Sequence, residues 1–272
     1  CNNWFGVVVL LASRVVVVRG VDVYAMVLKG LGFFSKPSVR RVVLKPNLIL
    51  DRFPPTTTPC ETVEALVEYY LEDYEVIIAE GSGCCDTNRA FQALGYSKIA
   101  EKYGVRLVDL NTDEYELRKN AKVYVLKEFE FPKTLAGSYI VSVPVLKEHS
   151  ITRVTLSLKN MLGATLGSGS AFARKGRFHR IGLDESIVDV NLYLKPRLAV
   201  IDGRVAGLGG ELNSRPKRMD VMIFSEDLVA ADSVGARLLG YDPLSIRHLR
   251  LAQEKGLGVA DPRRIEVIEV NL

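Results

Sequence analysis

The stretch Val76-Ile77-Ile78-Ala79-Glu80-Gly81-Ser82-Gly83 joins a run of four apolar residues directly to a polar turn rich in glycine. Three more apolar runs end in a similar way, at Lys45-Pro46-Asn47, at Lys147-Glu148-His149 and at Asp202-Gly203. In an open parallel sheet, ligands bind in the crevice beyond the carboxyl ends of the strands. We therefore expect these four clusters to converge on one site.

Segments of strand length alternate with segments of helical period along most of the chain. We expect strands at residues 13–20, 40–44, 75–79, 105–110, 139–146, 198–201, 220–224 and 264–270. Helices are expected at residues 22–32, 59–71, 91–103, 185–194, 228–239 and 246–255, and extended antiparallel segments at residues 115–131. Residues 150–162 are expected to form a helix, or a helix after a turn. This alternation predicts an α/β fold, with a largely parallel or mixed sheet that carries helices on both faces.

Individual residues indicate where some of these elements begin and end. Thr58 is predicted as the N-cap of a helix, with Pro59 at its first position and Glu61 at its third. Asp227 is expected to cap the helix that follows it. Pro144, near the end of its strand, indicates either an edge strand or a strand terminus.

Two glycine-rich stretches, residues 163–182 and 203–210, are expected to be loops. A loop as long as the first one is usually functional or disordered. We expect residues 13–272 to form a single domain, which could consist of two closely packed lobes that meet near residue 140. Residues 1–12 hold an apolar stretch too short to span a bilayer and are expected to be an N-terminal extension.

The composition is that of an ordinary globular protein: 272 residues, 48% hydrophobic, with 36 basic and 32 acidic residues and a net charge of +4. Because the excess charge is small and dispersed, we expect neither a nucleic-acid nor a membrane partner. The cysteines Cys1, Cys60, Cys84 and Cys85 show no spacing typical of zinc or iron–sulfur sites. Unpaired cysteines favour a cytoplasmic location, and two glutamines among abundant Val, Arg, Lys and Glu favour a thermophile.

Cationic and imidazole side chains are concentrated after these strand ends. Lys147 and His149 lie two residues apart, so in extended backbone they project from the same face and could act as a paired cation and general acid/base. Lys159 and His179 complete the candidate catalytic set. Candidate ligand-binding residues are Lys45, Asn47, Glu80, Ser82, Asn160, Arg180, Asp202 and Asp232. Such a set suits a carboxylate or phosphate ligand and a histidine that moves a proton near neutral pH.

Each of these interpretations has a structural alternative. His149 could cap backbone groups, and Lys159 could extend its ammonium to solvent. The turn Glu80-Gly81-Ser82-Gly83 could hold an anion on its backbone N–H groups, or could need glycine only for its shape. Asp202 could bind a divalent metal or orient a histidine, and Asp232 is either a site carboxylate or a buried ion-pair partner.

Several motifs follow one another along the chain: Lys45-Pro46-Asn47, Glu80-Gly81-Ser82-Gly83, Val143-Pro144-Val145-Leu146-Lys147-Glu148-His149, Leu158-Lys159-Asn160-Met161-Leu162-Gly163, His179-Arg180 and Asp202-Gly203. In this order they resemble the domain of unknown function 362 family, from about residue 14 to residue 258. Many members of that family are described as iron–sulfur proteins because they carry an appended ferredoxin-like domain with clustered cysteines. This sequence has no such cluster, so the resemblance implies that a ferredoxin-like partner would supply it.

Three kinds of function are compatible with the sequence. The first is an enzyme that acts on a small anionic substrate by His and Lys acid–base chemistry, with a divalent metal as a compatible cofactor. The second is a redox accessory protein whose iron–sulfur cluster belongs to a ferredoxin-like partner. The third is a ligand- or metal-binding module without catalysis.

Overall fold

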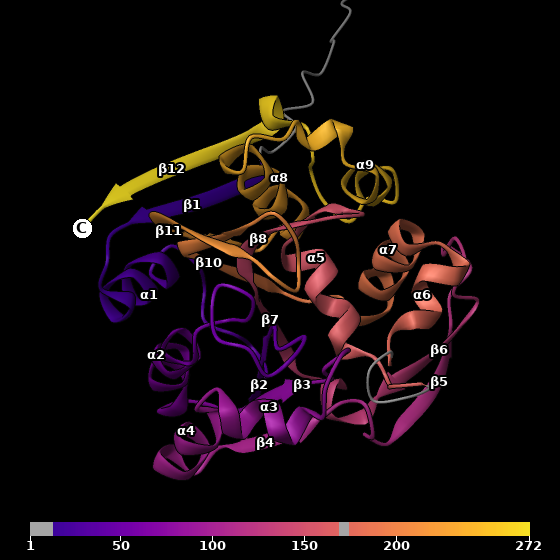
Figure 1. The fold of residues 1–272 in the computed structure, drawn as a ribbon, viewed down its shortest axis with the longest axis horizontal. Helices are drawn as coiled ribbons and strands as arrows, with labels where there is room; N and C mark the ends of the chain where they lie inside the picture. Colours follow the sequence, from indigo (N-terminus) through magenta and orange to yellow (C-terminus); the bar gives the residue numbers. More distant parts are fainter. Residues whose placement is uncertain (1–12, 169–173) are drawn as a thin grey trace, which may run out of the picture.

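A mixed β-sheet runs through the middle of the computed structural model, which describes residues 13–168 and 174–272 (Figure 1). Its main path, in spatial order, consists of β12 (Ile265–Asn271), β1 (Ser13–Arg19), β11 (Arg215–Ser225), β10 (Leu198–Leu208), β7 (Tyr139–Val143), β2 (Arg41–Pro46), β3 (Glu75–Glu80) and β4 (Arg106–Asp109). Neighbours from β10 to β4 are parallel, whereas β11 is antiparallel to β10 and β1. The predicted α/β fold is confirmed. The expected extension at residues 1–12 lies outside the described residues.

Two further strand groups accompany this path. β8 (Val145–His149) pairs with β10 and with the short β9 (Arg153–Thr155). β5 (Tyr115–Lys119) and β6 (Glu128–Pro132) form a separate antiparallel pair, which confirms the extended segments expected there.

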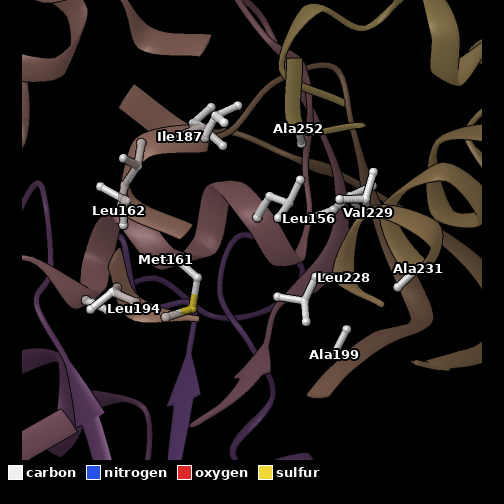
Figure 2. Close-up of a cluster of buried hydrophobic side chains, with 14 of the residues drawn as sticks. Leu156, Met161, Leu162, Ile187, Leu194, Ala199, Leu228, Val229, Ala231 and Ala252 are labelled. Atoms are coloured by element: carbon white, nitrogen blue, oxygen red, sulfur yellow. The ribbon is translucent and has the colours of Figure 1, made fainter. Parts of the chain in front are cut away.

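Helices cover both faces of the sheet because successive side chains of a strand point to opposite faces. In β1, Val16 and Val18 join one apolar cluster, whereas Val15 and Val17 join the other. The first cluster receives α1 (Val23–Leu31), α2 (Cys60–Leu71), α3 (Thr87–Ala93) and α4 (Tyr96–Tyr103). The second receives α5 (Ser157–Asn160), α6 (Gly176–Ile181), α7 (Leu183–Leu194), α8 (Leu228–Leu238) and α9 (Arg247–Glu254). Figure 2 shows this second cluster, where side chains of β10, α7, α8 and α9 meet.

Short 3₁₀ turns complete the described elements: η1 (Lys133–Leu135), η2 (Met161–Ala164), η3 (Pro243–Ser245) and η4 (Pro262–Arg264). Asp227 caps α8 as expected, because its carboxylate accepts a hydrogen bond of 2.9 Å from the Ala230 N–H. No helix in the described residues is long and apolar enough to cross a membrane.

Two predicted elements are divided by single residues. The helix expected at residues 91–103 is instead α3 and α4, because Gly95 adopts φ 88°, a left-handed conformation that glycine tolerates. The strand expected at residues 139–146 becomes β7 and β8, with Pro144 between them. Proline has no N–H to continue the ladder, so the predicted terminus is confirmed. The alternative of an edge strand is wrong, because β7 lies between β10 and β2.

Thr58 is not the N-cap that the sequence predicted. α2 begins at Cys60, and Pro59 precedes it without a side-chain cap. The Thr58 hydroxyl is used elsewhere: it donates to the Val143 carbonyl at 2.7 Å and accepts from the Asn47 N–H at 2.9 Å. Thr58 thereby ties the ends of β2 and β7 together.

Three predicted segments differ because tertiary pairing overrides local pattern. Residues 203–210 are not a loop: β10 continues to Leu208 and pairs with β11 across a bulge. Residues 150–162 begin with a turn, as one of the two alternatives expected, but β9 follows it and the helix α5 is short. The described part of residues 163–182 includes α6 and the end of η2, so it is less irregular than expected.

Candidate functional site

A cavity of about 270 Å³ opens at the carboxyl ends of β2, β3 and β8. The structure brings many of the predicted site residues together in its lining: Lys45, Asn47, Glu80, Lys147, His149, Lys159, Asn160 and His179. The lining also includes Cys84, Thr155, Lys175 and Glu211. The site therefore lies where ligands bind in parallel sheets.

Four other predicted residues lie outside this lining. The Ser82 hydroxyl donates to the Leu48 carbonyl at 2.6 Å, and Arg180 is exposed on α6. Asp202 forms an ion pair of 2.9 Å with Arg204. The carboxylate of Asp232, on α8, accepts hydrogen bonds from the first two backbone N–H groups of α5, at 2.7 and 2.9 Å. The last two residues therefore have structural roles in the described contacts.

The floor of the cavity is a buried ion pair between Lys45 and Glu80. The Lys45 ammonium donates to Glu80 Oε2 at 2.8 Å, to the Asn160 side-chain oxygen at 2.9 Å and to the Pro46 carbonyl at 2.7 Å. Burial lowers the pKa of Lys45, and the charge of Glu80 partly offsets this effect. Gly163 packs directly against this pair, because a Cβ there would lie 2.3 Å from Glu80 Oε1.

Lys147 also lines the cavity, and three acceptors hold its ammonium group. Its ammonium donates to the Asn47 side-chain oxygen at 3.0 Å, to the Thr56 carbonyl at 2.7 Å and to the Glu211 carbonyl at 3.3 Å. None of these contacts is a carboxylate. Burial, followed by repulsion from Lys159, lowers the pKa of Lys147 to about 7.

Lys159, on α5, lines the cavity without a hydrogen-bond or ion-pair partner among the described residues. Burial lowers its pKa to about 8, although the charge of Glu211 acts in the opposite direction. An ammonium that lacks a partner in a buried pocket is available for a ligand.

His149 has a defined orientation. Its Nδ1 accepts hydrogen bonds from the Ile151 N–H at 3.0 Å and the Thr152 N–H at 3.2 Å, so the neutral ring carries its proton on Nε2. Nε2 lies 3.7 Å from Glu211 Oε1. Burial, followed by repulsion from Lys159, lowers the pKa of His149 to about 3. His149 therefore caps backbone groups, as the structural alternative expected, and also presents an N–H donor to the cavity.

Glu211 supplies the second carboxylate of the cavity. Burial acts to raise its pKa, but hydrogen bonds from its own backbone, the neighbouring His149 and hydrogen bonds from Ser150 together lower the pKa to about 2. The Ser150 hydroxyl donates to Glu211 Oε2 at 2.9 Å. Glu211 therefore stays ionised and balances part of the positive charge contributed by the lysines.

Two lining residues were not predicted individually. Lys175 belongs to the basic stretch 174–180; its ammonium donates to the backbone and side-chain oxygens of Thr165, and burial lowers its pKa to about 7. Thr155 is 3% exposed, and its hydroxyl has no hydrogen-bond partner in the described structure. Local charge density marked the stretch that contains Lys175, but no local signal distinguishes Lys175 from the other cations of that stretch.

The glycine turn after β3 does not offer its first backbone donors to an anion. The Gly81 N–H donates to Glu80 Oε1 at 2.7 Å, and the Ser82 N–H donates to the Thr87 hydroxyl at 3.1 Å. A Cβ on Gly81 would lie 2.7 Å from the Gly163 carbonyl. This contact favours the interpretation that the turn needs glycine for its shape.

No group of three or more His, Cys, Asp or Glu side chains arranged to hold a metal ion occurs in residues 13–168 and 174–272. Cys60, Cys84 and Cys85 are free thiols. Cys84 lines the cavity, where burial, followed by the charge of Glu211, raises its pKa. A neutral thiol is a weak metal ligand and a weak nucleophile.

A larger groove, of about 1270 Å³, lies near the amino ends of β7 and β10, away from these side chains. Charged residues along it include Lys36, Lys122, Lys195 and Arg197, all of which are exposed. Charged side chains that are exposed to solvent interact only weakly, so these cations do not define a site for chemistry. We therefore place the candidate site in the smaller cavity.

The fold and the cavity define an α/β protein with a lysine-rich ligand pocket at the strand ends. The chain belongs to the family described as "Domain of unknown function (DUF362)", which matches residues 42–237. This range contains every residue that lines the cavity. The chain is also similar to the thylakoid-associated protein sll1697 of Synechocystis sp. (strain ATCC 27184 / PCC 6803 / Kazusa), with 26% identity over 243 residues, which cover 85% of this chain and 72% of that protein.

Proposed function

We propose that this protein is an enzyme that binds a small carboxylate or phosphate compound in the cavity and moves a proton with a lysine amine. The observation that carries the proposal is the charge balance of the lining. Lys45, Lys147, Lys159 and Lys175 face only two carboxylates, Glu80 and Glu211. An anion that enters would restore neutrality in a site where charge is poorly screened.

Lysine is a better candidate than histidine for the base. A general base has a pKa near the operating pH and a free lone pair directed at its substrate. The lone pair of His149 is already used by two backbone N–H groups, so His149 is better suited to donate a hydrogen bond to the ligand. Lys159, with a pKa lowered to about 8 and no hydrogen-bond partner among the described residues, can take up or release a proton near neutral pH. His179 lies exposed in the lining, where it is placed to meet a ligand that enters.

Binding of oxalate and of inorganic phosphate, measured by titration calorimetry, tests the proposal. We expect the variant Lys159→Met to bind the preferred anion about tenfold more weakly or worse, because it removes a charge-assisted contact. Lys98→Met is the matched control, because Lys98 is exposed and lies outside the lining. Affinity that is equal in both variants and in the unmodified protein would remove the cavity from consideration.

The other two functions lead to different results. A binding module without catalysis would bind an anion but exchange no substrate proton with solvent deuterium. The redox accessory protein depends on a ferredoxin-like partner chain and remains a prediction from the resemblance.

A further inference from the structure

The four cavity lysines differ in how many of their ammonium protons are engaged. Lys45 and Lys147 each contact three acceptors, which together match the three donors of an ammonium group. Lys175 contacts both oxygens of Thr165. Lys159 contacts no acceptor among the described residues, so its nitrogen alone can turn a lone pair toward a ligand without breaking a hydrogen bond.

We infer that Lys159 is a nucleophile that forms an imine with the carbonyl carbon of a small oxo acid bound in the cavity. The inference rests on the proposed anion binding and adds the class of substrate. The bond between Lys159 Nζ and the carbonyl carbon forms as the carbonyl electron pair moves to oxygen, and one of the two protons of the neutral amine passes to that oxygen. The second amine proton joins the resulting hydroxyl, which leaves as water, and the nitrogen electron pair completes a carbon–nitrogen double bond.

The surroundings of Lys159 meet the requirements of this reaction. A lysine is activated as a nucleophile when burial disfavours its charged form. Burial acts on Lys159 against the charge of Glu211, and with a pKa of about 8 about a tenth of it is the neutral amine at pH 7.

The remaining lining offers a place for each group of an oxo acid. Lys175 contacts two acceptors, so it keeps one ammonium donor for the carboxylate. The Thr155 hydroxyl is buried in the same lining and has no partner, so a carbonyl oxygen would satisfy it. A cavity of about 270 Å³ admits a compound of a few carbon atoms and excludes a large one.

Reductive trapping tests the inference. The intact chain is incubated with pyruvate and sodium cyanoborohydride, and its peptides are analysed by mass spectrometry. We expect one reduced pyruvate adduct on Lys159, formed about tenfold or more faster than on exposed lysines such as Lys98. Excess oxalate is expected to suppress the adduct, and acetaldehyde, which lacks a carboxylate, is expected to show a smaller preference for Lys159 than pyruvate does.

Variants separate this inference from the proposed function. Lys159→Arg keeps the charge and lacks an amine nucleophile, so it should form no adduct at residue 159. Oxalate binding by the unmodified chain without a Lys159 adduct would overturn the imine and leave the anion site standing. Absence of both would overturn both proposals. Labelling of Lys159 and Lys98 at equal rates would also overturn the imine, and this comparison needs only the unmodified chain.

Discussion

At the scale of single residues, burial rather than residue type distinguishes the lysines that can do chemistry from those that cannot. Lys98 and Lys159 are chemically identical, but only Lys159 faces a buried cavity, where desolvation disfavours its charged form. The sequence identified Lys147 and Lys159 because they follow apolar segments. It could not show that Lys147 would be saturated by three acceptors whereas Lys159 would have none, because the Thr56 and Glu211 carbonyls come from distant segments.

The same residues lead to a prediction about pH. Oxalate remains a dianion from pH 6 to 9, whereas Lys147 and Lys159 lose their protons near pH 7 and pH 8. The protonated lysines bind the anion, so above each pKa a proton must first be taken up. Affinity should therefore fall as pH rises, by up to about tenfold per pH unit for each lysine involved.

Calorimetric titration with oxalate at several pH values between 6 and 9 measures this dependence. The variant Lys159→Met should lose the inflection near pH 8 and move the inflection of Lys147 upward from about pH 7, because the repulsion from Lys159 is removed. Imine trapping should show the opposite dependence, because the neutral amine becomes more abundant as pH rises. An affinity independent of pH over this range would contradict the assignment of these lysines to the anion.

At the scale of elements, the site depends on a close approach between the turn after β3 and the segment after α5. Gly81 and Gly163 face each other there, and a Cβ on either would lie within 2.7 Å of the other segment. The sequence located both segments, because each follows an apolar run. Local sequence patterns could not predict their contact, since the elements from β4 to α5 lie between Glu80 and Gly163 along the chain.

The variant Gly163→Ala tests the importance of this contact. Its Cβ would meet both Glu80 Oε1 at 2.3 Å and Lys45 Nζ at 2.7 Å, and both side chains are buried. Overpacking of this kind destabilises a protein by about 1–3 kcal/mol, so we expect a lower free energy of unfolding in urea. Gly32→Ala is the matched control, because Gly32 has φ −60° and the nearest atoms to its Cβ lie at 3.4 Å. Equal stability of the two variants would show that the Lys45–Glu80 pair yields without strain.

At the scale of the whole molecule, the question is whether the chain unfolds as one unit or as two lobes that meet near residue 140. The sequence left both open because a chain of 272 residues is long enough for either. In the structure β7 lies in the middle of the sheet, in register with β2 on one side and β10 on the other. The two halves of the chain therefore share backbone hydrogen bonds and, through Val141, apolar packing.

We expect one cooperative transition, because a central strand cannot be lost from one half without unpairing the other. Val141→Ala should destabilise the protein by about 2 kcal/mol, since Val141 is fully buried. Hydrogen exchange in urea measures the free energy of unfolding separately at β3 and at β11. Val141→Ala should lower both values by the same amount. Val21→Ala, at a residue that is 63% exposed, should leave both within about 0.5 kcal/mol of the unmodified protein. Exchange that shifts in β3 but not in β11 would show that two lobes unfold independently despite their common sheet.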